Sequence, residues 1–172
     1  MEQKPKQFPR ENAEGWMKNW DNRTNLDAAE SFYEIIQRFL KEHGIDLTKN
    51  VKVLELGSGN AVFLGYLRKQ GVNVMGIDAN PRGSKEPSQV RARIERLPFI
   101  KESFDVILAS NVFDKKVYKN QDHNLMMQEI ARVLKHGGIF IGLTEKIEAQ
   151  PIKGLSLIPG NSIFKETIYQ KS

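Results

Sequence analysis

The sequence predicts a single α/β domain in which helices cover a mostly parallel sheet. Three observations support this prediction. Short apolar strands alternate with amphipathic helices from about residue 25 onward, the strand VLEL runs directly into a glycine turn, and two apolar runs, LSLI and IFKETIY, flank the turn PGNS near the end. Alternating strands and helices are typical of parallel sheets, whereas the last two runs indicate an antiparallel hairpin.

Composition limits the kinds of chemistry to be considered. The chain has 172 residues and a net charge of +5, which suits an acidic partner or simply a soluble surface. It contains no cysteine, which excludes disulfides, thiolate nucleophiles and cysteine-bound metals, and no metal site is expected. No apolar run reaches the length needed to cross a bilayer, so we expect a cytoplasmic protein with no membrane partner.

The N-terminal part of the chain divides into two segments. Residues 1–24 are polar and carry two prolines, and we expect a flexible segment there, with residues 25–172 forming the single domain. Trp16, Trp20 and Arg23 are candidates for a lid over a site, and packing of the two tryptophans on the core is an equal alternative. Apolar residues at helical spacing then predict a helix over 26–44, which extends the domain at its N-terminus.

The elements that follow are read from hydrophobic pattern and turn residues. We expect strands at 51–56, 72–78, 104–110 and 138–145, and helices at 61–71 and 122–138. The segment NPRGSKEPSQ at 80–89 contains two prolines and a glycine, which favour a loop where a helix would normally follow the second strand. That loop would leave one sheet face thinly covered and open to a partner chain.

The glycine turn is the first feature that points to a ligand. Gly57 and Gly59 lie between a strand and a helix, where backbone amides can approach a bound molecule without side-chain obstruction. Asp78 ends the next strand, at a position where a carboxylate can accept hydrogen bonds from ribose hydroxyls. The two features together indicate a ligand that contains a nucleoside. Val62 stands where a dinucleotide fingerprint would have its third glycine, which disfavours a nicotinamide cofactor.

Four segments in order resemble one family. Glu55, Gly57 and Gly59 resemble motif I of the class I S-adenosylmethionine-dependent methyltransferases. GIDAN at 76–80, LPFIKESFDVILASNVF at 97–113 and EIARVLKHGGIFI at 129–141 are similar to the later signatures of the type 11 members. The resemblance implies a Rossmann-like open sheet of about seven strands in the order 3214576, with only the last strand antiparallel and helices on both faces. It also implies S-adenosylmethionine as the cofactor.

The resemblance assigns the glycine turn to one end of that cofactor. Gly57, Ser58 and Gly59 would line its methionine and ribose end. Glu55 would steady the turn, or would reach the cofactor's ammonium group through water.

The remaining cofactor residues follow the later strands. Asp78 would bind the ribose hydroxyls with Ala79 beside the adenine, Ile94 would offer its backbone N–H to the ring, and Ser110 and Asn111 would lie under the methyl group. Arg93 occupies the position where the family usually has an aspartate that accepts from the adenine amino group. Because arginine has no acceptor, cofactor affinity depends on a substitute, either Glu95 or a backbone carbonyl.

The function implied is methyl transfer to an oxygen or nitrogen of a small-molecule acceptor. The NPPY-type signature of enzymes that methylate amino groups of bases is missing, and SNVFD stands in its place. A methyltransferase acting on RNA or protein, with RNA not favoured, and an inactive binding module of the same fold remain alternatives. A homodimer or another partner chain would complete a shallow acceptor pocket.

No catalytic residue is predicted. Groups considered for the acceptor side are Asp114, Tyr118, His123 and Glu145. For His123, the favoured expectation is an exposed residue in a capping turn.

Overall fold

The computed structural model describes residues 26–79, 81, 86–110, 112–113, 120–143, 147, 151–159 and 166–172. The expected N-terminal segment 1–24, with the candidate lid residues Trp16, Trp20 and Arg23, lies outside the described residues.

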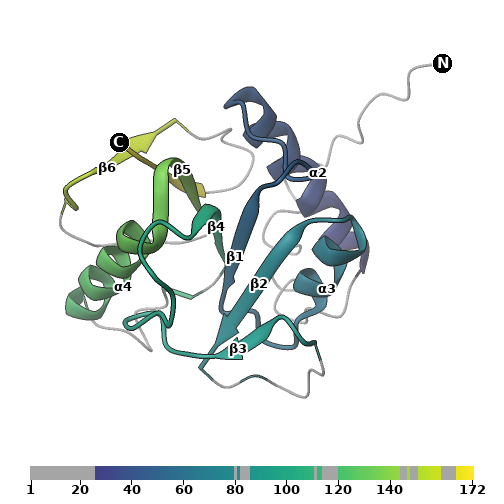
Figure 1. Cartoon of the computed structure of the whole chain (residues 1–172), viewed down its shortest axis with the longest axis horizontal. Coiled ribbons are helices and arrows are strands. Elements are labelled where there is room, and N and C mark those ends of the chain that lie inside the picture. The colour runs from purple at the N-terminus through teal and green to yellow at the C-terminus, as the bar shows by residue number, and fades with distance from the viewer. Residues whose placement is uncertain are drawn as a thin grey trace, which may run out of the picture.

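The strands of the described residues form one seven-stranded sheet (Figure 1). They are β1 Lys52–Leu56, β2 Asn73–Asp78, β3 Gln89–Arg91, β4 Phe104–Ser110, β5 Leu134–Leu143, β6 Leu155–Ile158 and β7 Glu166–Lys171. Their order is β3-β2-β1-β4-β5-β7-β6, and β7 runs antiparallel to both β5 and β6, while the pairs on the β3 side of β5 are parallel. The predicted strand order, the single antiparallel strand and the terminal hairpin are confirmed.

Helices cover both faces of this sheet, as predicted (Figure 1). The helices α2 Leu26–Glu42 and α3 Val62–Lys69 pack on one face, where Phe32 and Leu64 meet Val53 and Val106 in one buried cluster. The helix α4 Asn120–Val133 packs on the other face. Successive strand residues point to opposite faces, so Leu54 and Ile107 bury against α4 rather than α2. None of the helices in the described ranges has the length and apolar character needed to cross a bilayer.

The described part of the connection from β2 to β3 is irregular, as expected from its prolines. Residues 79, 81 and 86–88 lie in bends, turns or irregular backbone, with no helix among them, and the rest of this connection lies outside the described residues. Glu86 forms an ion pair with Arg68 of α3, and Gln89 N–H donates to Glu86 O at 3.0 Å. The ion pair therefore holds the C-terminal end of this connection against α3.

The C-terminal part of α4 differs from the prediction. The helix ends at Val133, and β5 begins at Leu134, four residues earlier than the expected strand at 138–145. The pairing with β4 shifts register between Phe104 and Val106, and the extra residues of β5 include Gly137 at φ 75°. Within α4, Leu125 is 48% exposed, whereas its neighbours Met126 and Met127 are buried.

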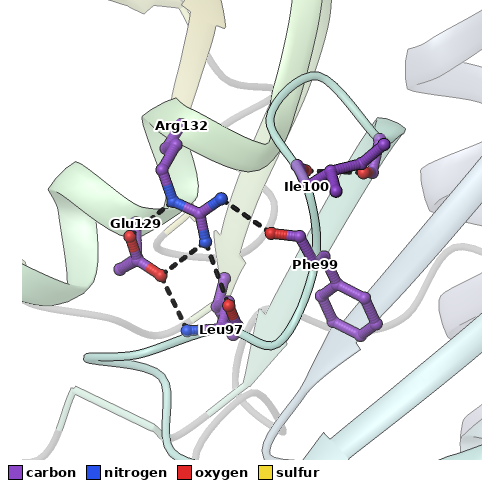
Figure 2. Close-up of polar contacts among 6 residues, drawn as sticks. Leu97, Phe99, Ile100, Glu129 and Arg132 are labelled. Atoms are coloured by element: carbon purple, nitrogen blue, oxygen red, sulfur yellow. Dashed lines mark hydrogen bonds and ion pairs between the residues drawn. The ribbon is translucent and has the colours of Figure 1, made fainter.

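A charged pair on α4 holds the segment that leads into β4 (Figure 2). Arg132 Nε donates to Glu129 Oε1 at 2.6 Å, and its two terminal nitrogens donate to Phe99 O at 2.7 Å and Leu97 O at 3.0 Å. Glu129 Oε2 accepts from Leu97 N–H at 2.7 Å. Charge-assisted hydrogen bonds of this kind are stronger than neutral ones, so the pair fixes the backbone of Leu97 on both its N–H and its carbonyl. We call this arrangement the α4 clamp.

The α4 clamp makes part of the stability depend on pH. Hydrogen bonds from Arg132, followed by that from Leu97 N–H, hold the pKa of Glu129 below its ordinary value of 4.5 against the opposing effect of burial. Because the folded-state pKa is lowered, the contribution is complete above the unfolded-state pKa and is lost as pH falls through the folded-state pKa.

We therefore expect Glu129→Gln to lower the free energy of unfolding by about 1–3 kcal/mol near neutral pH, and to lower it much less at about pH 3. Urea unfolding of both proteins at the two pH values measures this difference. Glu42→Gln, at the exposed end of α2, serves as the control. Its free energy of unfolding should equal that of the wild type at both pH values. A constant difference between Glu129→Gln and the wild type at the two pH values would contradict the assignment.

Candidate functional site

Four parallel strands end at the same edge of the sheet and bring the predicted residues together. In register, Leu56 lies beside Ile77 and Ala109, and Asp78 lies beside Arg91. Strands β2 and β3 lie on one side of β1, and β4 and β5 lie on the other, so the chain reverses its direction of winding at β1 and β4. The crevice at such a reversal, outside the carboxyl ends of the strands, is where open α/β sheets bind ligands.

The turn after β1, residues 57–61, has a backbone that few side chains permit. Gly57, Gly59 and Ala61 have φ values of 67°, 52° and 60°, all in the left-handed region. Alanine rarely adopts that conformation, so the surrounding contacts must hold Ala61 in it. Ala61 N–H donates to Ser58 O at 2.7 Å, and Ala61 O accepts from Gly65 N–H at 2.9 Å in α3. We call residues 57–61 the glycine loop.

Hydrogen bonds to β2 hold the glycine loop in place. Ser58 N–H donates to Ile77 O at 2.9 Å, and Gly59 N–H donates to Asp78 Oδ2 at 2.9 Å. The carboxylate predicted to bind ribose is thus also the group that orients the loop. Asp78 therefore couples the position of the loop to the end of β2.

Gln89 of β3, which no sequence pattern indicated, supports the same loop from one strand further away. Its side-chain Nε2 donates to Ser58 Oγ at 2.8 Å and to Gly59 O at 2.9 Å. The Ser58 hydroxyl in turn lies 3.2 Å from Ile77 O, and the Ser58 side chain is buried. The hydroxyl is therefore engaged inside the protein. Gln89 lies in a three-residue strand and gave no pattern by which it could have been found.

Close packing at two glycines explains why side chains are absent there. A Cβ on Gly57 would clash with Cγ1 of Val112, which follows β4. A Cβ on Gly76 of β2 would lie 2.7 Å from Leu64 Cδ2 and 2.8 Å from Ser58 Oγ. The first contact brings the chain after β4 against the glycine loop, and the second lets α3 and the loop approach β2.

The far side of the crevice is formed by residues 92–97. Ala92 N–H donates to Asp78 O at 3.1 Å, and Arg91 Nε donates to the carbonyl of the exposed Ala79 at 3.2 Å. Ile94 is 5% exposed and its side chain lies in the cluster under α4. The α4 clamp fixes this segment at Leu97. Hydrogen bonds from Arg91 and Ala92 thus connect this segment to Ala79 and Asp78, and the α4 clamp holds its other end.

The other predicted positions are distributed around this crevice. Glu55 is buried near the end of β1, and Ser110 ends β4 and is half-buried. Asn111, Asp114, Tyr118 and Glu145 lie outside the described residues.

His123 corrects a prediction. We expected an exposed residue, but its exposed fraction is 0%, and its ring lies edge-on to Phe113 with centroids 5.3 Å apart. The helix begins at Asn120, and His123 shares its inward face with Met126, Met127 and Ile130 at spacings of three, four and seven residues. That spacing was visible in the sequence and could have placed His123 inside.

Comparison with known proteins finds a family model that matches this chain. The family model described as "Methyltransferase domain" matches residues 54–142, more than half of the chain. The chain belongs to this methyltransferase domain family. The match covers the glycine loop, Asp78, the segment 92–97 and the α4 clamp, which together form the crevice.

Curated relatives of this methyltransferase domain are longer proteins. An uncharacterised methyltransferase of Mycobacterium leprae is 28% identical over 123 residues, which cover 66% of this chain and 44% of the relative. The biotin biosynthesis bifunctional protein BioHC of Cellvibrio japonicus is 33% identical over 95 residues, 51% of this chain and 18% of that protein. The chain thus spans less than half the length of either relative.

Solved structures support the fold of the methyltransferase domain. The PH0226 protein of Pyrococcus horikoshii superposes with a TM-score of 0.58 at 18% identity, over 87% of this chain and 93% of that one. A TehB-like SAM-dependent methyltransferase of Corynebacterium glutamicum gives 0.56 at 19% identity, over 86% and 100%. At these identities the likeness concerns the fold alone.

A side chain at Gly57 should destabilise the fold. Gly57→Ala combines a left-handed φ with a steric clash against Val112, and we expect it to lower the free energy of unfolding by about 2–4 kcal/mol. Gly65→Ala is the matched control, because Gly65 lies inside α3 and its Cβ would meet only Glu86 Oε2, at 3.8 Å. That change should raise stability by roughly 0.5–1 kcal/mol. Urea unfolding of both variants checks the pair, and equal effects would show that the loop tolerates a side chain.

Proposed function

We propose that the chain binds S-adenosylmethionine at the carboxyl edge of the sheet and transfers its methyl group to an oxygen or nitrogen of a small molecule. One observation carries the proposal. The glycine loop, the Asp78 carboxylate and the segment 92–97 converge at the reversal point of a methyltransferase-domain sheet, through hydrogen bonds among themselves. A nucleoside ligand with a charged amino-acid tail suits an arrangement of backbone donors and acidic acceptors.

The chemistry of the side chains at this edge fits the donor groups of that cofactor. S-adenosylmethionine presents an ammonium group, two ribose hydroxyls and an adenine amino group, all of which need acceptors. Besides the Asp78 carboxylate, Asn60 Oδ1 and Glu95 Oε2 are buried acceptor atoms that have no hydrogen-bond donor among the described parts of the chain. Buried acceptors are normally satisfied, so their presence at this edge supports a donor-rich ligand.

The contribution of the protein is binding and alignment. When bound, the cofactor supplies a methyl group already activated on a sulfonium, so a strong catalytic base is not required. Asp78 would hold the ribose, the glycine loop would line the methionine end, and Val112, which lies against Gly57, would restrict water beside the loop. Holding the acceptor in line with the methyl group then accounts for most of the acceleration.

A second candidate is methylation of RNA, which the basic residues near the crevice favour. Arg91, Arg93 and Arg96 are all exposed beside the end of β3. Arg93 pairs with Glu95 and Arg91 contacts Ala79 O, so two of the three guanidinium groups already have partners within the protein. We therefore rank this candidate below the small molecule.

Isothermal titration with S-adenosylmethionine tests the binding step. We expect the wild type to bind at micromolar strength and Asp78→Ala to lose at least about tenfold in affinity, because it removes an acidic acceptor and releases Gly59 N–H. Asp105→Asn is the control. Asp105 is an acid of β4 that accepts from Lys52 N–H at the opposite edge of the sheet, and its replacement should leave the affinity unchanged. No heat with the wild type would overturn the proposed cofactor.

Transfer of label from methyl-labelled cofactor separates the acceptor classes. Three separate mixtures contain a low-mass metabolite filtrate, total RNA or unfolded protein. We expect label in the filtrate alone. Label in RNA that weakens steeply with salt would favour the RNA candidate, because phosphate contacts release counterions. Cofactor binding without transfer to any fraction would favour an inactive binding module.

A further inference from the structure

A side chain of β3 reaches across β2 to the glycine loop. Strand β2 lies between β1 and β3 (Figure 1), and Gln89 of β3 is the register neighbour of Gly76 of β2. Register neighbours point to the same face of a sheet. Here it is the face that α3 covers, because a Cβ on Gly76 would lie 2.7 Å from Leu64 Cδ2. Since Gly76 has no side chain, the Gln89 amide can cross β2 at this point and meet the loop.

The Gln89 amide makes two hydrogen bonds to the loop, which we call the Gln89 bridge. Its Nε2 donates to Ser58 Oγ at 2.8 Å and to Gly59 O at 2.9 Å, which uses both hydrogens of the amide. From the neighbouring strand, Asp78 Oδ2 accepts from Gly59 N–H at 2.9 Å. Two different strands therefore hold the two backbone polar groups of Gly59.

The Gln89 bridge fixes the orientation of the peptide group between residues 59 and 60. This peptide is trans, so its N–H, which belongs to Asn60, points in the opposite direction to the Gly59 carbonyl. Nothing accepts from Asn60 N–H among the residues that the structure describes. Half a turn of the peptide would put a carbonyl in the place of that donor. Gln89 thus keeps an available backbone donor on the side of the loop that faces away from β3.

The same contacts hold a strained residue. Ala61 has a φ of 60°, and its Cβ makes this left-handed backbone unfavourable. Gly57 and Gly59 carry no such cost, because they have no Cβ. Without the Gln89 bridge, we expect the loop to relax toward conformations in which Ala61 is no longer left-handed. The bridge therefore acts against the local preference of the loop backbone.

We propose that Gln89 is a positioning residue for the amino-acid tail of the cofactor, and that it acts by holding the 59–60 peptide and Ala61 in the conformation that receives this tail. The inference rests on the proposed function, in which the glycine loop lines the methionine end. A ligand carboxylate is attracted by a backbone N–H and repelled by a carbonyl oxygen, so a turned peptide would weaken binding of the tail.

The test compares two ligands that share one nucleoside, S-adenosylhomocysteine and 5′-methylthioadenosine, of which only the first carries the amino-acid tail. Gln89→Met keeps the length of the side chain and removes both donated hydrogen bonds. We expect the dissociation constant of S-adenosylhomocysteine to rise at least about tenfold, and that of methylthioadenosine to rise at most about threefold. Titration calorimetry measures both constants.

Gln170→Met is the matched control. Gln170 lies in β7, and its Nε2 is 3.4 Å from Gly137 O, toward the amino end of β5 and away from the crevice. Both ligands should keep their wild-type affinities in this variant. Gln89 itself is half-buried in an edge strand, so its replacement leaves the core intact, which thermal unfolding verifies. A purely structural role for Gln89 would weaken both ligands by the same factor, and this result would contradict the proposal.

Ala61→Gly tests whether Gln89 acts through the loop backbone, because glycine adopts the left-handed conformation without the cost of a Cβ. In the wild-type background we expect this change to alter the affinity for S-adenosylhomocysteine by less than about twofold, since the bridge already holds the loop. In the Gln89→Met background it should recover at least about threefold of the lost affinity. Equal effects of Ala61→Gly in the two backgrounds would overturn this route of action.

The outcomes separate this inference from the function on which it rests. If the wild type binds S-adenosylhomocysteine and Gln89→Met binds it equally well, the role of Gln89 is wrong while the cofactor stands. If the wild type binds neither ligand, the proposed function fails, and the role of Gln89 fails with it.

Discussion

The hydrogen bonds that hold the glycine loop to β2 and β3 are the constraint on which the rest of the site depends. Three consecutive strands contribute, because Ser58 follows β1, Asp78 ends β2 and Gln89 begins β3. The left-handed backbone is open to Gly57 and Gly59 but costly at Ala61, and the contacts of the loop compensate for that cost. A loop fixed before a ligand arrives loses little entropy on binding, which is how a small domain can bind a flexible cofactor.

The opposite wall of the crevice is fixed independently, through α4. Glu129 and Arg132 lie one helical turn apart, and together they hold Leu97 and Phe99 at the end of the turn that carries Ile94 and Glu95. Asp78 contacts both, because its carbonyl accepts from Ala92 N–H and its carboxylate accepts from Gly59 N–H of the loop. Asp78 therefore links the two walls, and its replacement should disturb the geometry of both.

Much of the fold could be predicted from the sequence, because hydrophobic period and turn residues are local properties. The strand FDVILAS was located to the residue, and the strand order followed from the resemblance of four ordered segments. Errors came where packing decides between neighbours. His123, expected to be exposed, lies inside against Phe113, because the rotation of α4 is set by the sheet beneath it.

The sequence by itself determined the fold class, the family, the glycine loop and the acid at the end of β2. Each of these depends on residue types and their spacing within a single stretch of the chain. The tertiary structure decided which side chains support that loop and which acceptors remain at the crevice. Gln89 lies about 30 positions from the loop that it holds. Glu95 differs from an ordinary surface glutamate because Arg93 pairs with one of its oxygens and the other oxygen is buried. Contacts between distant segments are fixed by packing, which no local pattern records.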